Sequence, residues 1–417
     1  MVALCVVAAA IGVWWALEKP GLLWGAGFIV GEEKPAVRFA LPEPTGRYTV
    51  GNTEIHLVDP DRPDPWAEGR PRELMVSVWY PAQDVDGHSL SPYMTPKATS
   101  RFERSSLESV GLDPEEVDLE GVRTHAFSGA PVDASQGRRP VVVYSPGAGL
   151  PRTVGTALVE DLASRGYIVV TVDHTYEASE VEFPEGRVEV AKLPEDASLK
   201  EMVSVRVSDI RFVLDQLEAV RDGGNPDAEG RRLPRGLDDS LNLSEVGMFG
   251  HSAGGFTSAE AMLDDRRIDA GINLDGSLIY SSDAGTYGEV TKRGLDRPFM
   301  LVGAGTSGDD DKPHTHQSSP DWGLFWENST GPKIDLHIPE GEHFTFTDYQ
   351  AILPQLDEKL DIPNWLFTAT IGTVDPDRIV TSQRAYVAAF FDQHLRGEDQ
   401  TLLEGPSPHH PDVDFVR

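Results

Sequence analysis

Residues 246–255 read Val-Gly-Met-Phe-Gly-His-Ser-Ala-Gly-Gly, and the core of this stretch, Gly250-His-Ser-Ala-Gly254, has the form G-x-S-x-G. The apolar residues 246–249 predict a short buried strand, and the helix-forming residues 256–263 predict a helix after the turn. A strand, a tight glycine turn and a helix together form a nucleophile elbow, which presents a serine hydroxyl at the end of a sheet. A side chain at either glycine would crowd the strand against the helix. We therefore predict that Ser252 is a nucleophile.

Strand-like and helix-like segments alternate on both sides of this motif. The β-branched run 140–144 is followed by a predicted helix over 154–165 and a second strand over 167–172, which implies a parallel β-α-β unit. Such alternation favours a doubly wound, mostly parallel sheet flanked by helices, and with a nucleophile elbow this is the α/β-hydrolase fold. The other predicted strands are 73–80, 270–274, 299–302 and 334–338, and the other predicted helices are 199–220 and 378–395.

We divide the chain into an apolar N-terminal segment (1–31), a linker (32–47), one catalytic α/β-hydrolase domain (48–400) and a tail (401–417). The uncharged run 1–17 lies at the short end of a membrane span, so we expect a membrane anchor or a signal segment. Either would associate the enzyme with a membrane or lead to its secretion, and the expected location is extracytoplasmic. A helix packed on the domain of a cytoplasmic enzyme is the alternative.

The composition excludes several classes of function. The formal net charge is −32, from 36 Lys and Arg against 68 Asp and Glu. Phosphate backbones are bound by cationic side chains, so we expect no nucleic-acid partner. The single cysteine, Cys5, lies in the apolar N-terminal segment, so we expect no disulfide, no thiol nucleophile and no cysteine-based zinc site in the domain.

Candidates for the base and the acid come later in the chain. A serine hydroxyl needs a base that removes its proton, and in this fold an acid and then a histidine follow the serine. His343 lies in a loop directly after the last predicted strand, where the base is expected. Two positions stay open for the acid: Asp275 ends the first strand after the motif, and Asp310 follows the next strand. Either carboxylate could orient the imidazole.

The oxyanion of a tetrahedral intermediate needs two backbone N–H donors. The amide of Ala253, the residue after the serine, is the first candidate. The second should come from the loop 146–149, in which Pro146 has no N–H. We predict Ala148 as this second donor, with Gly147 next.

His314 and His316 flank Thr315 close to three aspartates, 309–311. An H-x-H pair with carboxylates nearby is weak evidence for a metal site, and we interpret this segment as a solvated loop. We expect neither a metal ion nor another cofactor.

The chain resembles the bacterial relatives of platelet-activating-factor acetylhydrolase of the plasma type, isoform II, over roughly residues 40–400. The resemblance implies a serine carboxylic-ester hydrolase that acts through an acyl-enzyme without a cofactor. In that family the acid follows the strand after the elbow strand, which implies Asp275, and the oxyanion position corresponds to Ala148. The resembling stretches are 41–48, 72–82, 144–149, 173–174, the helix with Arg206 and Asp209, 250–255, 274–275 and His343.

The resemblance also bears on the substrate. It implies small-molecule or lipid esters with short acyl groups, such as sn-2 acetyl phospholipids. A general esterase, lipase or polyester hydrolase is the close alternative, and a catalytically silent binding protein of the same fold is the alternative of another class. The chain departs from the family at Pro146, where histidine is common, and in part at 173–176, so the substrate range stays open.

Overall fold

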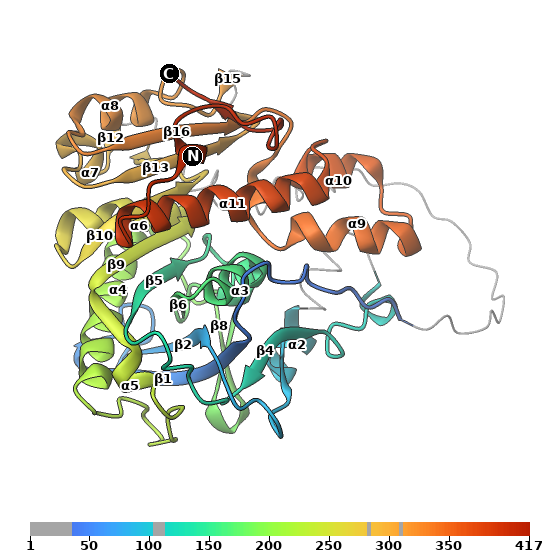
Figure 1. Ribbon diagram of the computed structural model, residues 1–417, viewed down its shortest axis with the longest axis vertical. Coiled ribbons are helices and arrows are strands. Elements are labelled where there is room, and N and C mark those ends of the chain that lie inside the picture. The colour runs from blue at the N-terminus through green and yellow to red at the C-terminus, as the bar shows by residue number, and fades with distance from the viewer. Residues whose placement is uncertain (1–35, 103–112, 282–284, 308–311) are drawn as a thin grey trace.

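The computed structural model describes residues 36–102, 113–281, 285–307 and 312–417. Its centre is a twisted sheet with helices on both faces (Figure 1). The strands of this sheet are β1 (Val50–Pro63), β2 (Pro71–Pro81), β3 (Leu90–Pro92), β4 (Arg123–Ser128), β5 (Arg139–Ser145), β6 (Ile168–Asp173), β9 (Leu241–His251), β10 (Ile268–Leu274), β13 (Phe299–Ala304), β16 (Lys333–Ile338) and β17 (Asp414–Phe415).

The strand order in the sheet is β17-β16-β13-β10-β9-β5-β6-β2-β1-β4-β3. From β6 to β16 every neighbouring pair is parallel, whereas β2 runs antiparallel to both β6 and β1. The predicted α/β-hydrolase fold, with its mostly parallel sheet, is thus confirmed. Outside the sheet, the described residues form three small antiparallel pairs: β7 (Glu180–Phe183) with β8 (Arg187–Val190), β11 (Ile279–Ser281) with β12 (Thr286–Tyr287), and β14 (Thr306–Ser307) with β15 (Lys312–Pro313).

Helices cover both faces of the sheet. Side chains of α4, α6, α7 and α8 join the apolar core on one face, and those of α3 and α11 join the core on the other. The helices are α2 (Pro96–Phe102), α3 (Thr156–Ser164), α4 (Leu199–Arg221), α5 (Leu237–Ser240), α6 (Ala253–Asp264), α7 (Glu289–Arg293), α8 (Pro320–Asn328), α9 (Tyr349–Leu360), α10 (Asn364–Ile371) and α11 (Pro376–Leu395).

Local sequence explains the central elements. In β5 the residues Val141, Val142 and Val143 are fully buried, because helices shield both faces of a parallel strand. Helix α4 begins with a capping box, in which the Ser198 side chain and the Glu201 side chain each bond the other's backbone amide.

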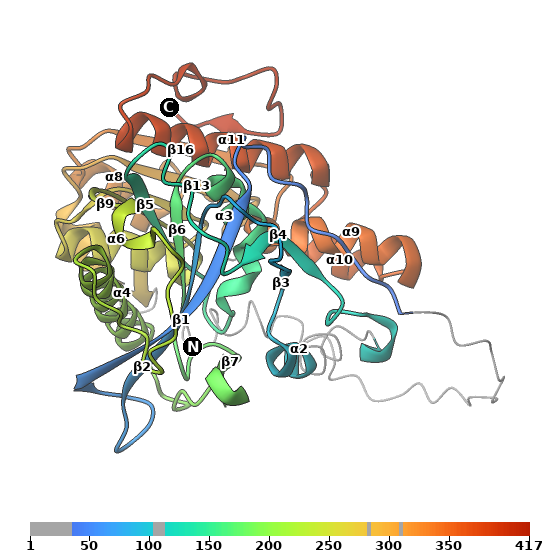
Figure 2. The same ribbon diagram turned by 60° about the horizontal axis from the view of Figure 1, so that its bottom comes forward.

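Helices α9 and α10 lie side by side near one end of α11, and α2 lies close to β7 (Figures 1 and 2).

The globular part extends beyond the predicted domain 48–400 at both ends. Residues 36–47 pack on the domain instead of forming a free linker, since Phe39 and Leu41 are buried in an apolar cluster with α9 and α10. Residues 401–417 do not form a loose tail, because β17 pairs with β16. The predicted N-terminal anchor (1–31) lies outside the described residues. No helix among the described residues is long and apolar enough to cross a membrane.

The contact of α11 with the sheet should supply a large share of the stability. Phe391 is fully buried, with its ring centroid 6.2 Å from that of Phe249 and 6.3 Å from that of Tyr167. Phe391→Ala should lower the free energy of unfolding by about 3–5 kcal/mol, because it opens a cavity in the core. Chemical denaturation of the purified protein measures this change.

The matched control is Trp365→Ala in α10, where the side chain removed is as large but 54% exposed. Its effect should stay within about 0.5 kcal/mol. Equal effects of the two truncations would contradict the role given to α11.

Candidate active site

Ser252 stands at the junction of β9 and α6 in the strained conformation of an elbow. Its φ is 55° and its ψ is −122°, a region that residues with side chains rarely adopt. Close backbone contacts leave no room for a side chain at Gly250 or Gly254. A Cβ on Gly254 would lie 1.9 Å from the carbonyl oxygen of Ser145, and one on Gly250 would lie 2.3 Å from the carbonyl carbon of Gly254. The backbone turn is therefore held in a form that glycine alone allows at these positions.

His343 and Asp275 are joined by a short hydrogen bond. His343 Nδ1 lies 2.6 Å from Asp275 Oδ2. An Nδ1–H that donates to the carboxylate leaves the lone pair on Nε2. The His343 side chain is 30% exposed, so this nitrogen stays within reach of small molecules. The other candidate acid, Asp310, lies outside the described residues.

The sheet brings Ser252, Asp275 and His343 to the same edge. The amide of Ser252 donates to the carbonyl of Leu274 (2.8 Å), the residue before Asp275. His251, the residue before Ser252, donates from Nε2 to the backbone carbonyl of His343 (2.8 Å). The Ser252 hydroxyl has no hydrogen-bond partner among the described residues, and catalytic hydrogen bonds are often long or poorly aligned outside the Michaelis complex.

A second histidine contacts Asp275 from the opposite side. His314 Nδ1 lies 2.7 Å from Asp275 Oδ1, which also accepts the amide of Ala304 at 3.0 Å. The imidazole of His314 stacks on Trp322, with ring centroids 4.0 Å apart. The prediction of a solvated loop is wrong for His314, which is 5% exposed, because stacking and an ion pair stabilise its burial. Asp275 thus accepts three N–H groups with one carboxylate.

Burial and charge act in opposite directions on this cluster. Burial alone would raise the pKa of Asp275, but His314 and His343 hold that pKa well below its usual range. Burial would lower the pKa of His314, but the Asp275 carboxylate outweighs burial and raises it. Burial and the nearby His343 lower the pKa of His251 to about 3, so His251 is neutral near pH 7.

The loop after β5 lies over the elbow. A Cβ on Gly147 would be 2.9 Å from His251 Nδ1, so the loop approaches the elbow closely. The buried Arg206 guanidinium fixes this loop by donating to the carbonyls of Pro146 (2.6 Å) and Gly147 (3.1 Å). The amide of Ala148 and the amide of Ala253, the latter at the start of α6, donate to no acceptor among the described residues.

A second Ser–His–Asp chain lies inside the protein. Ser145 Oγ is 2.9 Å from His174 Nε2, and His174 Nδ1 is 2.9 Å from Asp209 Oδ2. All three residues are at most 1% exposed, so no ester can reach them. Asp209 also pairs with the buried Arg72. These hydrogen bonds connect the sheet to α4. They follow the order of a catalytic triad, but a substrate has no access to the serine.

Within the described ranges, no group of three or more His, Cys, Asp or Glu side chains could hold a metal ion. His316, the partner of His314 in the H-x-H pair, bonds Asp335 through Nδ1 at 2.6 Å and stacks on Trp326. The two histidines therefore point to separate carboxylates.

Comparison with known proteins identifies the family to which this chain belongs. Residues 36–292 match the family model described as platelet-activating factor acetylhydrolase, isoform II. The chain belongs to this family. A relative from Arthroderma benhamiae, named a probable 1-alkyl-2-acetylglycerophosphocholine esterase, is 29% identical over 403 residues, which cover 91% of this chain and 94% of the relative. The platelet-activating factor acetylhydrolase of the dog is 25% identical over 58% of this chain and 56% of its own length.

Among solved structures, a ferulic acid esterase from Streptomyces cinnamoneus is similar to this chain with a TM-score of 0.72. The two sequences are 38% identical, and the match covers 91% of this chain and 99% of the esterase. Together with the family, these relatives make this protein a carboxylic-ester hydrolase of the α/β-hydrolase fold.

The charged pair of His314 and Asp275 predicts a pH-dependent contribution to stability. The pKa of His314 is raised in the folded state, so this stabilisation is complete below the unfolded pKa, about 6.5, and is lost as the pH rises through the folded pKa. The pKa of Asp275 is lowered, so its share is lost only in strong acid. His314→Asn should therefore lower the free energy of unfolding by about 1–3 kcal/mol at pH 5.5 and by less at pH 9.

Denaturation at the two pH values measures the difference. The exposed His409, changed to Asn, is the control and should show no pH-dependent deficit. A deficit for His314→Asn that is the same at both pH values would show that the residue contributes by packing alone.

Proposed function

We propose that this esterase acts through Ser252 as nucleophile, His343 as general base and Asp275 as the carboxylate that orients His343. The amides of Ala253 and Ala148 are the proposed oxyanion donors. The observation that carries the proposal is the 2.6 Å hydrogen bond between His343 Nδ1 and Asp275 beside a serine in an elbow conformation.

In the first half of the proposed reaction, Ser252 Oγ attacks the ester carbonyl while His343 Nε2 takes its proton. The carbonyl oxygen becomes negative and accepts hydrogen bonds from Ala253 and Ala148. The tetrahedral intermediate then collapses, the bond to the alcohol oxygen breaks, and His343 gives its proton to the leaving alcohol. The product of this half is an acyl-Ser252 ester.

In the second half, water attacks the acyl-enzyme and His343 accepts a proton from it. Collapse of the second tetrahedral intermediate releases the carboxylic acid, and the proton returns from His343 to Ser252. Asp275 stays ionised throughout, because its two histidine partners hold its pKa far below neutral pH. The α6 N-terminus favours the negative oxygen through its dipole.

For the substrate we propose esters of short acyl groups on lipid-like alcohols. The support is the family and the Arthroderma benhamiae relative, whose name gives a 2-acetyl phospholipid and whose match covers nearly the whole of both chains. The apolar run 1–17 supports an extracytoplasmic location, where such lipids are met at a membrane surface.

A second candidate is hydrolysis of hydroxycinnamoyl esters. The structure named ferulic acid esterase is 38% identical to this chain, more than the 29% of the phospholipid esterase relative. The two candidates share the proposed chemistry and differ in the ester that is bound.

The nucleophile is tested with a fluorophosphonate, which labels activated serines. Ser252→Ala should lose the label and should lose hydrolysis of p-nitrophenyl acetate by about 10⁴-fold or more, because no other serine in the described part of the chain has the elbow conformation. Mass spectrometry of the labelled peptide identifies the serine.

The internal chain offers a matched control. Ser145→Ala removes the serine of the buried Ser–His–Asp chain and should keep the label on Ser252, provided that thermal unfolding shows a folded protein. If Ser252→Ala were still labelled while Ser145→Ala were not, the assignment of the two serines would be reversed.

The acyl group is tested by kcat/KM on a panel of esters. An sn-2 acetyl phospholipid should be hydrolysed with a kcat/KM at least about 10-fold higher than the same lipid with a long sn-2 chain, the discrimination expected from a few methylenes in a small site. Methyl ferulate is the comparison substrate for the second candidate. A highest kcat/KM on methyl ferulate would reject the short-acyl proposal in favour of the second candidate, and equal values across the panel would indicate a general esterase.

A further inference from the structure

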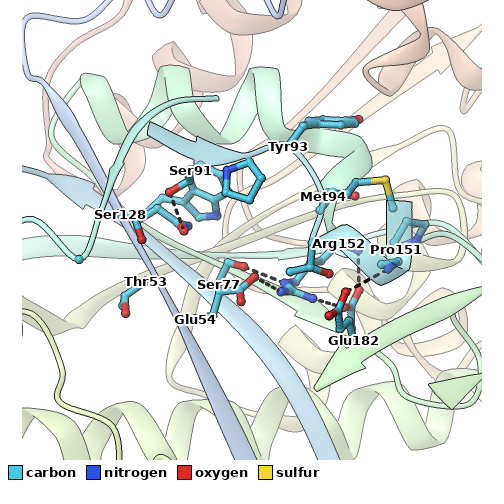
Figure 3. A pocket seen from close by; sticks show the side chains of 18 of the residues that line it. Thr53, Glu54, Ser77, Ser91, Tyr93, Met94, Ser128, Pro151, Arg152 and Glu182 are labelled. Carbon is cyan, nitrogen blue, oxygen red and sulfur yellow. Dashed lines mark hydrogen bonds and ion pairs between the residues drawn. The ribbon is translucent and has the colours of Figure 1, made fainter. Parts of the chain in front are cut away.

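A cavity of about 290 Å³ lies beside the first two strands of the sheet (Figure 3). Its floor is one face of β1 and β2, and its walls come from the β3–α2 segment, β7 and the turn around Arg152. Ser252, Asp275 and His343 are not among its lining residues. We propose that this cavity binds a hydroxyl-rich molecule about the size of a monosaccharide.

Two buried N–H donors on the cavity floor have no acceptor among the described residues. Asn52 Nδ2 and Trp79 Nε1 form no hydrogen bond with that part of the chain, and the two residues are only 6% and 5% exposed. They stand directly opposite each other on β1 and β2, so their side chains lie on the same face about 5 Å apart at Cβ. Burying an unpaired donor is costly. A ligand that brings oxygen acceptors would relieve both.

The other side of the cavity is lined by five carboxylates and three arginines: Glu54, Asp173, Glu180, Glu182 and Asp227, with Arg152, Arg231 and Arg232. The Arg152 guanidinium donates to Ser77 Oγ (2.7 Å) and Glu54 (2.6 Å) and pairs with Asp173, so that two carboxylates share one cation (Figure 3). Glu180 is 2% exposed and has the Ser179 hydroxyl at 2.9 Å as its hydrogen-bond partner. This side offers acceptor atoms to a ligand that donates hydrogen bonds.

The combination of donors and carboxylates selects the chemistry of the ligand. A hydroxyl group both accepts from an N–H and donates to a carboxylate, so a polyol satisfies both sides at once. An anion would meet more carboxylates than arginines in this lining, whereas a simple ammonium ion would leave Asn52 and Trp79 unpaired. A volume of about 290 Å³ lies at the lower end for ligand pockets, about 300–1,000 Å³, which limits the ligand to a small molecule.

The cavity reaches the same edge of the sheet as Ser252. Asp173 ends β6, and β6 is separated from the elbow strand β9 by β5 alone, a span of about 10 Å across two inter-strand spacings. The turn with Arg152 directly follows the loop that holds Ala148. The hydroxyl-rich molecule therefore has two sources: the alcohol part of an ester substrate, which rests on the proposed function, or a free polyol bound separately.

Binding is tested by isothermal titration calorimetry on the full chain carrying Ser252→Ala, which removes turnover. D-glucose, D-arabinose and glycerol are the probes, with choline and acetate as cationic and anionic controls. At least one sugar should bind, and the two ions should not. Trp79→Phe keeps an aromatic ring but removes the N–H, and should weaken sugar binding about 10-fold.

Trp365→Phe, the same change at a position 54% exposed on α10, is the matched control and should leave the affinity unchanged. Asn52→Asp replaces the second donor with an acceptor at nearly the same size and should also weaken binding. Failure of every sugar to bind, or equal affinity in the wild type and in folded Trp79→Phe and Asn52→Asp proteins, would overturn the proposal.

Kinetics of the active protein separate the two sources. If the cavity takes the alcohol part of the substrate, the free sugar inhibits competitively, and Trp79→Phe raises KM for a mono-acetylated sugar but not for ethyl acetate. If the polyol binds separately, the sugar does not compete and the two KM values stay unchanged. An inactive wild type would refute the proposed function and leave the calorimetric result intact.

Discussion

The contact between the carbonyl oxygen of Ser145 and the backbone of Gly254 fixes the geometry of the sheet edge that holds the proposed site. Helix α6 starts so close to the end of β5 that a Cβ on Gly254 would lie 1.9 Å from this oxygen. The chain can reach α6 from β9 only through a sharp turn, and Ser252 takes the strained φ that this turn requires. The same contact places the loop with Ala148 beside the start of α6, so the proposed nucleophile and both proposed oxyanion donors depend on it.

Two Ser–His–Asp arrangements in one protein show what distinguishes a site from a structural network. The internal arrangement, Ser145 with His174 and Asp209, is surrounded by the buried cations Arg72 and Arg206 and never meets solvent. At the edge of the sheet, Asp275 is flanked by two imidazoles, one of them partly exposed. His343 is partly exposed and His174 is fully buried, so access to solvent separates the proposed site from the internal arrangement.

The sequence predicted the elements that local patterns define and missed those that long-range pairing creates. The strand before Ser252, the helix after it and the loop position of His343 follow from apolar runs, glycines and spacing, and the structure has them at these places. Strand β1 was not predicted, because prolines and polar residues interrupt its alternation and its pairing with β2 stabilises it instead. The sequence predicts a solvated His314, since the carboxylate of Asp275 and the indole of Trp322 that bury it lie 39 and 8 residues away in the chain. The H-x-H pair of His314 and His316 is weak evidence on its own. No local sequence pattern predicts that His314 contacts Asp275, which follows β10.

The two border strands of the sheet affect how the protein behaves in concentrated solution. One border strand, β3, is three residues long and the other, β17, is two residues long. Strands this short leave few free amide and carbonyl groups on which a neighbouring molecule could add a strand of its own. The formal net charge of −32 adds repulsion between copies of the chain. Short borders and a strong negative charge thus keep a large, open sheet from becoming a template for aggregation.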